Sequence, residues 1–209
     1  MQNNIEYFEF RIPQILKLGF PESKLSLLKD YISLLWKANE ELNLVSRKMT
    51  FIELIDNHLL DSLLPLYYFP KKINSVADFG SGGGFPGVIY AICFPEKKFY
   101  LFEKSPKKQE FLKSCAIISP NIIVSGEIPI ELINIDLVIS RAFKPIDVIL
   151  DMSRRYYLNG GRYFLLKGRL DKINEEVSDA VKKFKDLKLN IQPLNSPVLE
   201  VERNLVLIN

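Results

Sequence analysis

A glycine-rich segment directly after a hydrophobic run constrains the fold of this chain more than any other feature. Residues 75–87 read SVADFGSGGGFPG, so a short apolar stretch leads straight into closely spaced glycines. Glycine permits positive φ and lets a ligand lie against bare backbone, and Pro86 suits the first turn of a helix. The segment therefore predicts a strand, a ligand-binding turn and the start of a helix.

From residue 75 onward, short β-branched and aromatic runs alternate with windows of helical periodicity. We predict strands at 75–79, 98–102, 121–125, 136–140 and 162–167, separated by helices at 86–94, 106–118, 145–157 and 170–186. Alternating strands and helices indicate a parallel sheet covered on both faces. Two final strands near 188–193 and 200–208 have no helix between them, so we expect an antiparallel hairpin at the end of the sheet.

The first seventy residues have a different pattern. Apolar residues at helical spacing form one face over 25–36, and Thr50 and Glu53 have the spacing of a capping box that opens another helix. We therefore expect an N-terminal helical extension over 1–70, followed by an α/β domain over 71–209.

Several classes of protein are excluded or disfavoured by the residues that are rare. The apolar stretch at 88–94 is far shorter than the ~20 residues of a membrane span, and the N-terminus lacks the features of a signal peptide. A cytoplasmic protein without a membrane anchor is expected. The chain has one histidine, and Cys93 and Cys115 show no metal-ligand spacing, so we expect no metal site and no zinc hydrolysis.

The net charge of +3 is unevenly distributed, because acidic residues outnumber basic ones up to residue 70 and basic residues prevail afterwards. A basic second half is compatible both with a solvated surface and with a site for a polyanion. The basic residues there occur in groups: Lys71/Lys72, Lys104/Lys107/Lys108, Arg141/Lys144, Arg154/Arg155, and then Arg162, Lys167 and Arg169.

Two carboxylates discriminate between the ligands that a glycine turn can hold. Residues 82–87 satisfy G-x-G-x-x-G, so a nicotinamide-dependent oxidoreductase remains an alternative. Asp78 precedes the first glycine, where it would attract a ligand ammonium and repel a pyrophosphate. Glu103 follows the second strand, where a carboxylate can accept both ribose hydroxyls. Together with the terminal hairpin, these features favour S-adenosylmethionine (SAM) over a dinucleotide.

The segment D-x-G-S-G-x-G-x-P-G at 78–87 resembles the glycine motif of the RsmG (GidB) family of bacterial small-subunit ribosomal RNA methyltransferases. The resemblance extends over roughly 30–208. Other segments resemble the family in the same order: Trp36 to Leu44, His58-Leu-Leu-Asp61-Ser62, Lys107-Lys108 with Phe111-Leu112, Ser140-Arg141-Ala142-Phe143, Leu166-Lys167-Gly168 and Arg203-Asn204-Leu205.

The resemblance implies a Rossmann-like methyltransferase fold and SAM-dependent methylation of guanine N7 in 16S ribosomal RNA. The expected partner is this RNA or the assembling small subunit, and a monomer is expected. The chain departs from the family's G-R-A-E-E in the loop after the third strand, where it has Gly-Glu-Ile-Pro at 126–129. The cofactor residues expected from the motifs and the resemblance are Asp78, Gly80, Gly82, Phe85, Glu103, Glu127, Ile128 and Arg141.

The available side chains permit methylation at N7. Guanine N7 has an in-plane lone pair and no proton to remove, so the reaction needs alignment rather than a general base. The chain lacks the polar-Pro-Pro-aromatic clamp typical of exocyclic-amine methylation, and neither cysteine follows a strand as a nucleophile for carbon methylation would. The chemistry permits N7, and the resemblance selects it.

Three residues are candidates for the acceptor side of the site. Phe143 follows the fourth strand and would stack on a flipped guanine, although a core position is the alternative. Lys167 and Arg203 lie near predicted strand ends, as Arg141 does, where open α/β sheets bind ligands. Each could be an ordinary surface charge, but together they favour contact with RNA phosphate.

His58, Asp61 and Ser62 contain the residue types of a hydrolytic triad. Their spacing places them on one helix, whereas triads draw their members from separate loops, so we expect a hydrogen-bond cluster that fixes the helix. A third functional class also remains open, namely an RNA- or ribosome-binding module that has lost catalysis.

Overall fold

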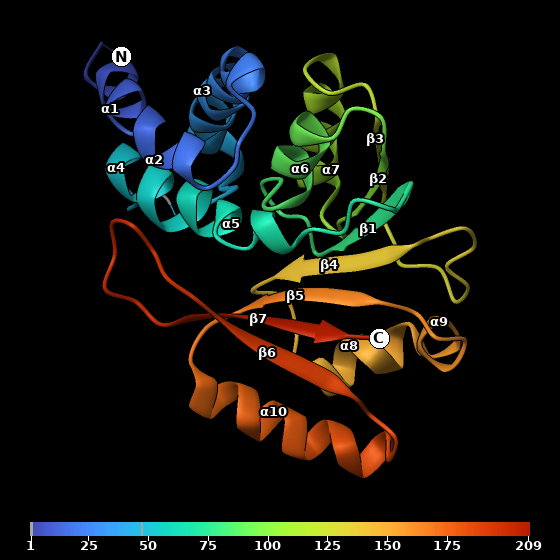
Figure 1. Ribbon diagram of the computed structural model, residues 1–209. Helices are drawn as coiled ribbons and strands as arrows, with labels where there is room; N and C mark the ends of the chain where they lie inside the picture. The colour runs from blue at the N-terminus through green and yellow to red at the C-terminus, as the bar shows by residue number, and fades with distance from the viewer. Residues whose placement is uncertain (1, 47) are drawn as a thin grey trace.

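The computed structural model describes residues 2–46 and 48–209 and contains a seven-stranded sheet in the order β3-β2-β1-β4-β5-β7-β6 (Figure 1). The first five strands run parallel, and β7 runs antiparallel to both β5 and β6. The predicted parallel sheet with an antiparallel terminal hairpin is confirmed. The strands are β1 (Ser75–Phe79), β2 (Lys98–Phe102), β3 (Ile122–Ser125), β4 (Leu137–Arg141), β5 (Tyr163–Lys167), β6 (Leu189–Leu194) and β7 (Arg203–Ile208).

Helices cover both faces of the sheet, as Figure 1 shows. One face packs against α6 (Gly87–Cys93), α7 (Pro106–Ser114) and the N-terminal helices, and the other against α8 (Ile146–Met152), α9 (Arg154–Leu158) and α10 (Leu170–Lys183). Every residue of β1 is buried, as expected for a central strand with helices on both sides.

The N-terminal part is helical and shares its core with the sheet. Its helices are α1 (Gln2–Phe10), α2 (Ile12–Lys17), α3 (Leu25–Leu42), α4 (Phe51–Leu54), a π-helical turn η2 (Ile55–Leu60) and α5 (Asp61–Leu63). The predicted capping box is confirmed, because Glu53 N–H donates to Thr50 Oγ1 and Thr50 N–H donates to the Glu53 carboxylate. One continuous core joins α3 to β1 and β2, and the division at residue 70 stays a prediction.

Helix α3 packs against the buried side of the glycine loop. The Tyr31 hydroxyl, fully buried, donates to the carbonyl oxygen of Gly83 at 2.7 Å. The side chains of Leu35 and Leu44 also lie against Gly83. The N-terminal helices therefore fix the loop that the sequence marks as the ligand-binding turn.

Three of the predicted helices differ from the observed ones by an internal break or by several residues at one end. The helix predicted over 145–157 is divided at Ser153, whose buried hydroxyl is bonded to the Ile149 carbonyl and to the Tyr163 hydroxyl. Helix α7 stops at Ser114 and continues as a 3-10 turn at Cys115–Ile117, and α10 stops at Lys183. Within the described residues, no helix combines the length and apolar character needed to cross a membrane.

Candidate cofactor and acceptor site

The glycine loop is anchored to the end of the neighbouring strand. The backbone N–H groups of Gly80 and Ser81 both donate to the carbonyl oxygen of Phe102, at 2.9 and 3.1 Å. Gly80 and Gly82 have φ values of 72° and 55°, a region that side-chain-bearing residues rarely adopt. The glycines at these two positions are therefore required by the path of the turn.

Glu103 lies beside this loop, directly after β2. One carboxylate oxygen accepts the N–H of Gly82 at 3.0 Å, and the other accepts the N–H of Ser105 at 2.8 Å. Each oxygen keeps acceptor capacity, because a carboxylate oxygen offers two lone pairs. The carboxylate thus fits the chemistry of a ribose diol at the carboxyl edge of the sheet.

The Asp78 side chain lies on the buried side of the glycine loop, not on the side that is open. The side chain is fully buried, and its Oδ2 accepts the N–H of Gly87 at the start of α6, at 3.2 Å. Its Oδ1 is buried and has no hydrogen-bond partner among the residues that the structure describes. Asp78 caps α6 in this structure, and its contact with a ligand ammonium stays a prediction.

Burial raises the pKa of Asp78 to about 7. Because this pKa lies above the ordinary value of 3.8, Asp78 keeps its proton in the folded state at pH values where the unfolded state has released it. The contribution of Asp78 to the free energy of unfolding therefore falls as pH rises from about 4 to about 7. We expect Asp78→Asn to remove this pH-dependent decrease in stability. Urea unfolding of the wild type and the variant at several pH values measures the free energy of unfolding of each. A stability difference between the two proteins that is independent of pH would contradict the prediction.

A cleft of about 680 Å³ opens at the same edge of the sheet. It lies between the helical segment 57–61 and the ends of β4, β5 and β7, where open α/β sheets bind ligands. The cleft brings the three acceptor-side candidates together with Arg141. Its lining residues include Asn57, His58, Asp61, Arg141, Phe143, Lys144, Lys167, Glu176, Arg203 and Asn204.

Phe143 separates this cleft from the glycine loop. Its ring is packed on Gly80 so closely that a Cβ atom added there would lie 2.2 Å from the ring atom Cδ2. The same ring makes an edge contact with Phe79. Phe143 is half-buried, so it is neither a pure core residue nor a free surface residue.

Asp61 joins the two arginines of the cleft. Its Oδ2 accepts Arg141 Nη1 at 3.1 Å, and its Oδ1 accepts Arg203 Nε at 2.5 Å. The Arg141 guanidinium also lies over the Phe85 ring, 5.2 Å from its centroid. Sequence reasoning did not find this role of Asp61, although its position in the H-x-L-D-S segment drew attention to it.

His58 completes the surroundings of Arg141. Burial, reinforced by the nearby Arg141 charge, lowers the pKa of His58 to about 4, so the ring is neutral near pH 7. Its Nδ1 accepts Arg141 Nη2 at 2.7 Å. The buried Ser62 hydroxyl donates to the His58 carbonyl at 2.7 Å, one bond within the helical segment. The His58 and Asp61 side chains bind the arginines of the cleft instead, so the expected cluster of all three residues does not form. The three residues do not form a hydrolytic triad.

The remaining predicted cofactor residues occupy different environments. Phe85 is buried between Tyr31, His58 and Arg141. Ile128 is half-buried against the core on the α8–α10 side, and Glu127 is exposed. Contacts of Phe85, Glu127 and Ile128 with a cofactor stay predictions.

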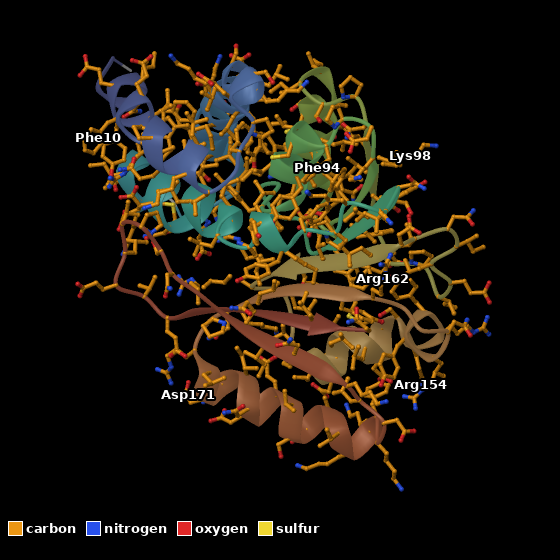
Figure 2. All side chains as sticks on the ribbon, viewed as in Figure 1. Phe10, Phe94, Lys98, Arg154, Arg162 and Asp171 are labelled. Carbon is orange, nitrogen blue, oxygen red and sulfur yellow. The ribbon has the colours of Figure 1, made fainter. Side chains whose placement is uncertain are left out.

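The basic groups seen in the sequence do not form one surface. Figure 2 shows Arg154 and Arg162 at one end of the sheet, whereas Asp171, which follows Arg169 by two residues, lies at the other end. Arg155 and Arg162 line a second hollow, of about 540 Å³, at the edge opposite the cleft. Lys104, Lys107 and Lys108, by contrast, follow β2 next to Glu103. Only part of the positive charge is therefore near the cleft.

Both cysteines are buried in the core, which raises the pKa of each thiol. Neither lines the cleft, so neither is placed to act as a nucleophile there. Across residues 2–46 and 48–209, no cluster of three or more His, Cys, Asp or Glu side chains is placed to hold a metal ion.

The fold is that of SAM-dependent methyltransferases with a Rossmann-like sheet. Aeropyrum pernix fibrillarin, solved with bound SAM, aligns with a TM-score of 0.54 at 12% identity over 72% of this chain and 73% of that one. A SAM-dependent methyltransferase from Aquifex aeolicus aligns with a TM-score of 0.53 at 13% identity, over 75% and 92% of the two chains.

Sequence comparison identifies the family within this class. The model of the GidB family, rRNA small subunit methyltransferase G, matches residues 24–206. The ribosomal RNA small subunit methyltransferase G 1 of Bdellovibrio bacteriovorus is 64% identical over 97% of this chain and 99% of its own length. The small subunit methyltransferase G of Borrelia garinii subsp. bavariensis is 35% identical, over 90% and 92%. The chain belongs to the GidB (RsmG) family, and its cofactor is SAM rather than a nicotinamide dinucleotide.

Proposed function

We propose that this enzyme, a SAM-dependent methyltransferase of 16S ribosomal RNA, transfers the methyl group to N7 of a guanine in the cleft beside the glycine loop. The observation that carries the proposal is the position of Phe143, whose ring borders both Gly80 and the basic cleft. An aromatic ring at this boundary can stack on a flipped base and hold it next to the cofactor.

The residues around the glycine loop fit SAM. Gly82 leaves the backbone open, Gly80 lies against the Phe143 ring, Glu103 offers carboxylate oxygens for ribose hydroxyls, and the buried Oδ1 of Asp78 lacks a partner within the described part of the chain. We assign cofactor binding to Asp78, Gly80, Gly82 and Glu103, with Phe85, Glu127, Ile128 and Arg141 as further candidates. Bound SAM supplies an electrophilic methyl group on its sulfonium.

The cleft contains no free general base, and methylation at N7 does not need one. Asp61 and Glu176 are engaged in ion pairs with basic side chains, and the His58 Nδ1 already accepts a hydrogen bond from Arg141. Arg203 instead supplies positive charge for RNA, and catalysis depends on aligning the guanine. We assign Phe143 to the base and Arg203 to the RNA side of the cleft.

The partner we propose is 16S ribosomal RNA, free or within an assembling small subunit, with the enzyme acting as a cytoplasmic monomer. The name of the Bdellovibrio bacteriovorus relative describes a small-subunit ribosomal RNA methyltransferase, which supports the choice of RNA. Transfer of labelled methyl from SAM to small subunits of a methylation-deficient strain tests the proposal. Labelling of 16S RNA supports it, whereas RNA binding without transfer would indicate a non-catalytic binding module.

The basic residues after β2 yield a prediction about affinity. Reversing the charges of Lys104, Lys107 and Lys108 should weaken RNA binding and make it less salt-dependent, by about one unit of the log–log slope for each lost phosphate contact. SAM affinity should stay nearly unchanged. Filter binding at several salt concentrations measures the slope, and an unchanged slope would show that these lysines are merely solvated.

A further inference from the structure

The segment that carries Phe143 has a strained backbone and is held in place by side chains of other elements. Ala142, directly after β4, has a φ of 50°, which a residue with a side chain rarely adopts. Such a conformation persists only where surrounding contacts enforce it. Two contacts hold the far side of this segment: Lys167 Nζ donates to the Lys144 carbonyl at 2.7 Å, and Ile146 N–H donates to Glu176 Oε2 at 3.0 Å.

These two contacts belong to one ion pair. Lys167, at the end of β5, lies 2.7 Å from Glu176 of α10, and their side chains are 11% and 24% exposed. Two of the three N–H donors of the Lys167 ammonium therefore bond Glu176 and the Lys144 carbonyl, and little of the side chain faces solvent. A lysine whose main task is to contact RNA phosphate would not need a carboxylate partner and a carbonyl of the Phe143 segment.

We infer that Lys167 and Glu176 are positioning residues, which hold segment 142–146 so that Phe143 stays at the boundary between the glycine loop and the cleft. This inference rests on the proposed function. It assigns Lys167 a different role from a direct phosphate contact, and it assigns a role to Glu176, which no sequence motif indicated.

The two roles predict opposite results for Glu176→Gln. If Lys167 contacts phosphate, removing the neighbouring carboxylate frees its charge, and RNA binding tightens. If the pair positions Phe143, Glu176→Gln and Lys167→Met both lower kcat at saturating SAM and RNA, by about 10- to 100-fold, because small misplacements of a reacting group are costly. The salt dependence of RNA binding then stays that of the wild type.

The decisive comparison uses Phe143→Ala as background. Residues that act through one another are not additive, so Lys167→Met should cost little further kcat once the ring is gone. Lys172→Met is the matched control, because it removes an exposed ion pair with Glu175 on the same helix and should leave kcat unchanged. If Lys167→Met does not fold, Glu176→Gln, which nearly preserves shape, carries the test.

Wild-type transfer in the same assay separates this inference from the proposed function. If the wild type transfers no methyl group to RNA, the proposed function fails. If the wild type is active and Glu176→Gln keeps full kcat or binds RNA more tightly, or if Lys167→Met makes the salt slope shallower by about one unit, only the positioning role is overturned.

Discussion

Replacing Gly82 by valine should abolish SAM binding and methyl transfer while the fold is retained. Among the residues that the structure describes, the only atom within 4 Å of a Cβ added at this position is the Gly80 carbonyl oxygen, 3.8 Å away, so the added Cβ makes no clash. The valine side chain would instead occupy the open side of the loop beside Glu103, where we place the cofactor. Calorimetric titration with SAM measures the loss.

The control for this variant must have the same backbone strain far from the site. Gly19 has a φ of 92° and, within the described part of the chain, no atom within 4 Å of an added Cβ, so Gly19→Val imposes a valine with positive φ in open space. Both variants should lose about 1–2 kcal/mol of stability from the strained residue. Only Gly82→Val should lose SAM binding, and normal SAM affinity in that variant would place the cofactor elsewhere.

Replacing Asp61 by alanine should be the most damaging change in the cleft. Arg141 and Arg203 would both lose their carboxylate acceptor, and Asp61 itself is only 9% exposed. Removing one partner from such a buried pair costs about 3 kcal/mol of stability, because the remaining charge is left uncompensated. Since both arginines also lose their fixed positions, we expect methyl transfer to fall by at least about 100-fold.

Chemical denaturation and methyl-transfer kinetics on the same preparations separate these two effects. Asp151→Ala is the control, because it removes an exposed ion pair with Arg154 and should cost less than about 1 kcal/mol. An Asp61→Ala variant with wild-type stability and activity would show that the two arginines do not depend on this residue.

Most of the sheet follows from local sequence patterns, because alternating strands and helices have few packing solutions. Strand order at the hairpin needed the structure, since β6 and β7 are both short apolar runs. In retrospect Pro193 marks β6 as the edge strand, because proline cannot donate a hydrogen bond to a further strand. The break at Ser153 coincides with a hydrogen bond to Tyr163, a tertiary contact that periodicity does not reveal.

In the site, too, some contacts follow from local sequence patterns, whereas others join residues that are distant in the sequence. Glu103 and the glycine loop were expected to meet because both follow neighbouring parallel strands, and they do. Asp61 lies 80 residues from Arg141 and 142 from Arg203 in the sequence, and spacing cannot predict such pairs. For Asp78 the motif predicts a ligand contact, whereas the structure shows a buried cap on the Gly87 amide.

In the proposed reaction, a site without a free general base methylates guanine N7. Small subunits from a methylation-deficient strain, incubated with the enzyme and methyl-labelled SAM, are digested to nucleosides and separated. We predict that the label elutes as 7-methylguanosine from 16S RNA. Label on an exocyclic amine, a ring carbon or a ribose, or on 23S RNA alone, would rule out methylation of guanine N7 in 16S RNA by this enzyme.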